Sequence, residues 1–148
     1  MVERKTALVS DQVATAVATL VIHDHKILLG KRIKNGVFEG WQCPGGYLLS
    51  GETLEDASKR ICLQKTGLEI EFLQTGPYTN NIFSEMQPVK HTVTLYLLVH
   101  LQKQINAESV KAGESEWFWF AAEKMPEPLF KPLKLLQEQC EIAQLISV

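Results

Sequence analysis

The stretch of sequence that decides the fold spans residues 46–68 and reads GYLLSGETLEDASKRICLQKTGL. Its central part predicts a helix over residues 53–66, because apolar side chains recur there at intervals of three and four residues. Thr53 is a natural N-cap, and Gly67 lies where a glycine commonly ends a helix. The apolar positions of this helix include Leu54, Ala57 and Ile61.

The rest of the chain predicts strands before and after this helix. Residues 1–12 are mixed and polar, and we expect them to form a loose lead-in. The apolar spacing over residues 129–146 predicts a C-terminal helix. The order of strands, helix, strands and helix is typical of an α+β or mixed α/β fold, and we expect one domain over residues 1–148. The predicted strands are 13–22, 26–32, 68–73, 92–101 and 116–121, with Gly76-Pro77 breaking the third.

Composition restricts the possible partners and the compartment. The 148 residues carry 17 acidic and 15 basic side chains, and a net charge of −2 argues against a basic nucleic-acid binder. The three cysteines form no C-x-x-C pair, which fits free thiols in a reducing cytoplasm. Because no run approaches the roughly 18 apolar residues that a membrane helix needs, we expect a cytoplasmic protein with neither nucleic acid nor membrane as its partner.

Segment 46–68 resembles the Nudix box, whose pattern is Gly, five residues, Glu, seven residues, then Arg-Glu-apolar-x-Glu-Glu-x-Gly-apolar. The resemblance extends from about Ala16 to Ala122 and includes an approach similar to the family's L-x-x-R and W-x-x-P-G-G motifs. It implies an α/β/α sandwich with a mixed central sheet, and metal-dependent cleavage of nucleoside diphosphates linked to another moiety. The matching residues of the box are Gly46, Glu52, Arg60, Gly67 and Leu68.

The chain departs from the family at the three metal-binding glutamates, where it carries Ile61, Gln64 and Lys65. These positions are related as i, i+3 and i+4 and therefore share one helix face. Three carboxylates on this face would bind magnesium through hard oxygen ligands. In this chain Ile61 offers no ligand, Gln64 offers a neutral carbonyl oxygen and Lys65 offers an ammonium. We therefore expect no metal at the usual site.

Four charged residues in or beside this helix keep a possible role. Glu52 and Arg60 match the family's box and are either a remnant of its catalytic site or a structural tie between loop and helix. Glu55 and Asp56 suit the first turn, where their charge complements the helix dipole. If the protein is active, Glu52, Glu55 and Asp56 are candidate relocated ligands for Mg²⁺ or Mn²⁺; no cofactor is otherwise expected.

The resemblance and the charges together indicate a set of ligand-binding residues. Adjacent glycines permit close approach of the backbone to a phosphate, and Lys65 offers a fixed positive charge without a metal. Acidic residues before the strand at 116–121 resemble a segment that contacts a base in some family members. The candidates are Arg32, Gly45, Gly46, Lys65, Glu114 and Glu116.

Three functions stay open from the sequence. The first is a degenerate Nudix hydrolase that retains a nucleotide or phosphate-bearing ligand, with impaired or absent magnesium-dependent pyrophosphohydrolase activity. The second is an active pyrophosphohydrolase with relocated metal ligands. The third is a non-catalytic interaction or regulatory module, for example a homodimer partner, since a fold does not fix a function.

Overall fold

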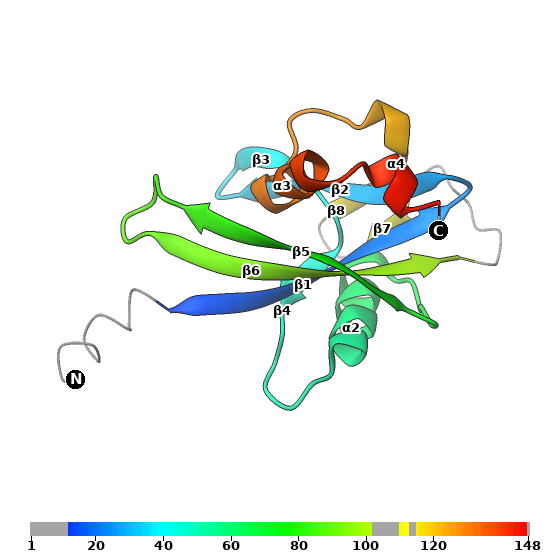
Figure 1. Cartoon of the computed structure of the whole chain (residues 1–148), viewed down its shortest axis with the longest axis horizontal. Helices are drawn as coiled ribbons and strands as arrows, with labels where there is room; N and C mark the ends of the chain where they lie inside the picture. Colours follow the sequence, from blue (N-terminus) through cyan, green and yellow to red (C-terminus); the bar gives the residue numbers. More distant parts are fainter. Residues whose placement is uncertain (1–11, 102–109, 113–114, 148) are drawn as a thin grey trace.

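The computed structural model describes residues 12–101, 110–112 and 115–147. In these ranges one sheet lies between α2 on one face and α3 with α4 on the other (Figure 1). The predicted α+β sandwich with a mixed central sheet is therefore confirmed. The elements are β1 (Val13–His23), β2 (Lys26–Lys34), β3 (Val37–Gln42), β4 (Gly45–Tyr47), α2 (Leu54–Thr66), β5 (Gln74–Phe83), β6 (Lys90–His100), β7 (Val110–Ala112), β8 (Ser115–Ala121), the short 3₁₀ helix η1 (Ala122–Lys124), α3 (Lys131–Gln139) and α4 (Ile142–Leu145).

The sheet has the strand order β5-β6-β1-β2-β8-β7, with β3 paired to β2 and β4 paired to β1. Strand β1 runs parallel to β6 along almost its whole length. It pairs with β2 only near the connecting turn, at Ile22–Ile27 and His23–Lys26. Because β1 and β2 separate beyond these residues, the middle of the sheet opens, and β3 and β4 line the two sides of the opening.

Alternate residues of β1 supply the two hydrophobic cores, since successive side chains of a strand point to opposite faces. Val17 and Val21 pack in the clusters that contain residues of α2. Leu20 and Ile22 pack on the opposite face, in the cluster that includes residues of α3 and α4. No helix among the described residues is long and apolar enough to span a membrane.

Helix α2 begins and ends where the sequence predicts. The Thr53 hydroxyl accepts a hydrogen bond of 3.0 Å from the backbone N–H of Asp56. At the other end Gly67 has a φ of 80°, and its N–H donates to the carbonyl of Leu63. Glycine adopts this left-handed backbone without the steric cost that a Cβ brings.

The prediction of a strand at 68–73 is wrong. The strand β5 begins at Gln74 and continues through Gly76-Pro77. The sequence pattern predicts instead that this Gly-Pro pair interrupts the strand. A register shift between Thr75 and Tyr78 absorbs the Gly-Pro pair, so that pairing with β6 resumes after it. Residues before Gln74 instead pack into the cores as a loop, with Ile70 buried.

The C-terminal segment is two helices rather than the one helix expected over 129–146. Helix α3 ends before Cys140, whose backbone is extended with φ −153° and ψ 158°. The chain then turns into α4, and Ile142 and Ile146 pack in the same core as Leu136. The apolar spacing continues across this break, and for that reason the sequence pattern alone predicts one helix.

A close contact between strands β2 and β8 requires a glycine. A Cβ built on Gly30 lies 2.7 Å from the ring of Trp117, which is 1% exposed and is held by a hydrogen bond of 2.9 Å from its Nε1 to the carbonyl of Lys65. We expect Gly30→Ala to lower the free energy of unfolding by about 1–3 kcal/mol through overpacking. Chemical denaturation measures this loss. Gly36→Asn is the control, and we expect it to lower the free energy of unfolding by less than about 0.5 kcal/mol. Asparagine tolerates the φ of 78° at this position, and nothing lies within 4 Å of an added Cβ. Equal losses in the two variants would contradict the explanation by overpacking against Trp117.

Strand β5 is an edge strand of the sheet, and α3 contacts its outer side. The Lys131 ammonium donates a hydrogen bond to the carbonyl of Ile82. The side-chain amide of Gln139 donates to the carbonyl of Tyr78 at 2.9 Å. Two carbonyls of this edge are thus occupied by side chains of the same chain.

Candidate functional site

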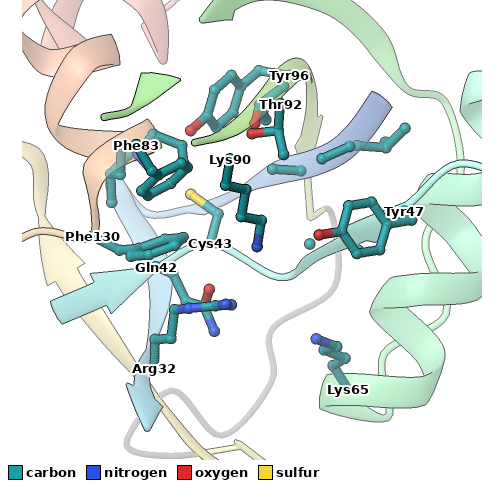
Figure 2. A pocket seen from close by; sticks show the side chains of 18 residues that line it. Arg32, Gln42, Cys43, Tyr47, Lys65, Phe83, Lys90, Thr92, Tyr96 and Phe130 are labelled. Atoms are coloured by element: carbon teal, nitrogen blue, oxygen red, sulfur yellow. The ribbon is translucent and has the colours of Figure 1, made fainter. Parts of the chain in front are cut away.

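A pocket of about 220 Å³ lies where β1 and β2 separate (Figure 2). Strand β1 contributes Ala16 and Ala18, whose small side chains leave space against the sheet. One side is closed by Cys43, in the turn from β3 to β4, and by Gly45 and Gly46 of β4. The lining ranges from fully buried residues such as Val17 and Leu133 to the exposed side chains of Tyr47 and Lys65.

Three cationic side chains from three different elements line this pocket. They are Arg32 of β2, Lys65 of α2 and Lys90 of β6. In Figure 2 the Lys90 side chain extends between Phe83 and Tyr47, and its nitrogen points towards the lower part of the view, where Arg32 and Lys65 lie on opposite sides. Lys65 is an exposed residue, and partial desolvation of its ammonium, then the nearby charge of Arg32, lower its pKa. No aspartate or glutamate is among the described residues that line the pocket.

The structure brings together four of the six ligand-binding candidates predicted from the sequence. These four line the pocket: Arg32, Gly45, Gly46 and Lys65. Glu116 lies on β8, is exposed and does not line the pocket. Glu114 lies outside the described residues.

Ile61 occupies the space beside Gly46 at the first of the three altered helix positions. Its side chain is 2% exposed, and it packs in a cluster with Val17, Ala57 and Leu97. A Cβ built on Gly46 lies 3.3 Å from the Ile61 Cδ1 atom. An apolar side chain thus packs at the position where the family pattern has a metal ligand.

Glu52 and Arg60 form a two-point ion pair that ties the loop before α2 to the helix. The Arg60 Nε atom lies 2.6 Å from one carboxylate oxygen of Glu52, and Nη2 lies 3.0 Å from the other. Nη2 also donates to the carbonyl of Tyr47, and the Glu52 carboxylate accepts from the N–H of Leu49. The Arg60 hydrogen bond holds the pKa of Glu52 below its ordinary value of 4.5. Whether this pair also acts in catalysis stays a prediction.

We expect the stability that Glu52 contributes to be lost in acid. Because its pKa is lowered in the folded state, the contribution is fully present above pH 4.5 and disappears as the pH falls through the folded pKa. Glu52→Gln should therefore melt below the native protein at pH 7, and the difference in Tm should close towards pH 3. Thermal melts from pH 7 to pH 3 measure it. Glu71→Gln, at an exposed loop position, serves as the control. Its Tm should differ little from that of the native protein at every pH.

The described residues do not fit a divalent metal site. No group of three or more His, Cys, Asp or Glu residues lies together within ranges 12–101, 110–112 and 115–147. Glu55 and Asp56 are exposed on the first turn of α2, and Glu52 is engaged by Arg60. The helix face that would offer carboxylates offers Ile61 and a lysine ammonium instead, and magnesium prefers charged oxygen ligands.

Several residues of the pocket were missed in the sequence analysis. Phe130 is placed there by contacts with β3, where its N–H donates to the carbonyl of Trp41 at 2.8 Å. This approach requires Gly40, whose φ is 118° and whose Cβ would lie 2.5 Å from the Phe130 nitrogen. Lys90, Thr92 and Thr94 of β6 alternate along the strand, and this polar alternation is the sequence feature that indicates that β6 lines the pocket. The missed residues include Gln42, Tyr47, Phe83, Lys90, Thr92, Thr94, Tyr96 and Phe130.

A second cavity of about 660 Å³ adjoins the first. The two share Arg32, Phe83, Lys90 and Phe130. The rings of Phe83 and Phe130 are stacked with centroids 6.1 Å apart, and the Arg32 guanidinium lies 4.3 Å from the Phe130 centroid. Together the cavities provide room beyond the smaller pocket for a ligand with a second moiety.

Comparison with known families identifies the class of protein that this fold and site represent. A family model described as the NUDIX domain matches residues 12–139. The "ADP-ribose pyrophosphatase" of Methanocaldococcus jannaschii is 32% identical over 130 residues, covering 84% of this chain and 72% of that protein. The chain belongs to the Nudix family. It spans 72%, 65% and 46% of the lengths of three curated relatives.

Solved structures share the fold at lower identity. A MutT NUDIX hydrolase from Burkholderia pseudomallei is 23% identical, with a TM-score of 0.74 over 87% of this chain and 98% of that chain. The NUDIX domain of Shewanella oneidensis NrtR, solved with ADP ribose, is 19% identical, with a TM-score of 0.61 over 91% of this chain and 96% of that chain. These likenesses support the fold assignment.

Proposed function

We propose that this protein binds a nucleotide or a nucleoside-diphosphate-linked ligand in the pocket lined by Arg32, Lys65 and Lys90, with little or no magnesium-dependent hydrolysis. The observation that carries the proposal is the replacement of the helix carboxylates by a buried Ile61 and by Lys65 at the pocket. Lys65 lies on the helix face where a metal ion would supply positive charge in the family. Its ammonium can supply positive charge there instead, and a positive charge close to a phosphate stabilises the bound anion.

The first ligand to test is ADP ribose, because one relative is named for its hydrolysis and one structural neighbour was solved with it. We expect ADP ribose or a related nucleotide to raise the Tm in a concentration-dependent way, both in EDTA and in Mg²⁺. Hydrolysis of a panel of nucleoside triphosphates and diphosphate conjugates, followed with Mg²⁺ and with Mn²⁺, should stay far below ~1 per second.

The same measurements decide between this proposal and its alternatives. Turnover at ordinary enzyme rates would contradict the proposal and favour an active enzyme with relocated metal ligands. Absence of any nucleotide-dependent change in Tm would favour a non-catalytic interaction module. A ligand that binds only with Mg²⁺ present would also contradict binding by the lysines alone.

A further inference from the structure

One wall of the pocket carries a buried polar network that the family resemblance does not explain. Thr92 and Thr94 of β6 line the pocket and are 6% and 4% exposed. The side-chain amide of Asn81 on β5, which is 0% exposed, donates to both hydroxyl oxygens, at 3.0 Å to Thr92 and 2.9 Å to Thr94. Burial of polar groups costs free energy that valine and leucine at these positions would avoid.

The direction of these two hydrogen bonds determines what the wall offers to a ligand. A threonine hydroxyl has one proton to donate and two acceptor sites. Because the Asn81 amide occupies an acceptor site on each oxygen, both hydroxyls keep their own proton to donate. The two residues are two positions apart on one strand and face the same side of the sheet. Asn81 therefore leaves two hydroxyl protons on this wall that can be donated to a ligand.

The charged side chains that line this pocket are all cationic, and one of them, Arg32, is paired with Glu39 at 2.9 Å. Lys90 lies at the start of the same strand, and Arg32 and Lys65 line the pocket from β2 and α2. Burial raises the pKa of Tyr96, the next lining residue along the face, well above its ordinary value, so this phenol stays protonated at neutral pH. The described lining carries three cations, hydroxyl donors and no carboxylate.

We infer that Thr92 and Thr94, set by Asn81 and accompanied by Lys90, recognise the phosphate or diphosphate oxygens of the ligand directly, without a metal ion. This inference rests on the proposed function and adds the residues that select the anion. A phosphate group that carries no magnesium has several acceptor oxygens, and charge-assisted hydrogen bonds from hydroxyls and ammonium groups match them. Asn81 is a positioning residue, since it acts through the two threonines.

The test measures the binding of inorganic pyrophosphate by calorimetry in EDTA, with the full chain. Thr92→Val and Thr94→Val keep the shape of the side chain and remove one donor each, and we expect each to weaken binding about tenfold, the effect of one charged hydrogen bond. Asn81→Asp should abolish detectable binding, because its carboxylate would accept both threonine protons and repel the anion. Thr19→Val is the matched control: Thr19 is buried on β1, its hydroxyl bonds to Ser58, and it does not line the pocket.

Each result supports or overturns the inference. Retained pyrophosphate affinity in Thr19→Val together with losses in the two pocket variants supports it. If the native protein binds pyrophosphate in EDTA and the Thr92→Val/Thr94→Val double variant binds within twofold of it, the inference fails while the proposed function stands. If the native protein binds neither pyrophosphate nor ADP ribose, both fail. Melting curves confirm that each variant is folded, and the valine variants carry the test if Asn81→Asp is not.

Discussion

Placing glutamate at positions 61, 64 and 65 together is expected to create a divalent-metal site and to raise Mn²⁺-dependent hydrolysis of a nucleoside diphosphate conjugate by on the order of 100-fold or more, equal to about 2.7 kcal/mol of barrier. The triple variant Ile61→Glu, Gln64→Glu, Lys65→Glu puts three carboxylates on one face of α2 and changes its charge by four units. Hard oxygen ligands grouped in this way bind Mg²⁺ or Mn²⁺, which can then activate water.

The same variant should become metal-dependent in its stability. Ile61 is 2% exposed, so a glutamate there without a cation leaves a buried carboxylate unpaired, at a cost of about 1–3 kcal/mol or more. Added Mn²⁺ should then raise its Tm, whereas the native Tm should change little.

A neutral variant separates charge from shape. Ile61→Gln with Lys65→Gln, beside the native Gln64, has side chains of similar size to the three glutamates but no carboxylate. We expect it to gain neither hydrolysis nor a Mn²⁺-dependent Tm. Equal hydrolysis by the native protein and the triple glutamate variant would contradict the interpretation that the lost acids limit the reaction.

Removing the ammonium of Lys65 is expected to weaken binding of ADP ribose or pyrophosphate in EDTA by about tenfold or more, since a hydrogen bond to a charged group contributes about 1.5–3 kcal/mol. The variant is Lys65→Met, which keeps the length of the side chain. Lys59→Met is the matched control, because Lys59 lies on the same helix and does not line the pocket. Calorimetry of both variants measures the difference, and equal effects would show that only the overall charge matters.

Lys65 also predicts the pH dependence of this binding. Its pKa is lowered by partial desolvation and by the charge of Arg32, and a bound anion favours the charged form. Affinity should therefore be full below the pKa of Lys65 in the free protein and should fall as the pH rises through it. Because this pKa is lower than that of an ordinary lysine, the native protein should lose affinity for the anion at a lower pH than a protein with an ordinary lysine there. Lys65→Met should lose this part of the pH dependence.

The sequence predicts those parts of the fold whose signals are local. The cap at Thr53, the apolar spacing of the helix and the glycine at position 67 lie within one segment, and α2 follows them closely. The start of β5 depends instead on pairing with β6, which a local pattern does not contain. The break at Cys140 likewise depends on how two helices share one core.

The same distinction applies to the site. Arg32 and Lys65 belong to the segments that match the family pattern, and both line the pocket. Lys90, Thr94 and Phe130 reach it only because β6 and α3 pack beside β1 and β3, and such long-range contacts leave no spacing in the sequence. The polar alternation in β6 was visible, but its relation to Asn81 depends on cross-strand register.

The contacts of α3 with the outer edge of β5 have a consequence for association between copies. An exposed edge strand invites a second chain to add its own strand, and occupied carbonyls oppose such growth. Lys131 and Gln139 each engage a carbonyl of this edge, so a second copy that docks there would have to displace them. Removing both side chains should make the protein more prone to aggregate, and any homodimer is expected to form through a different surface.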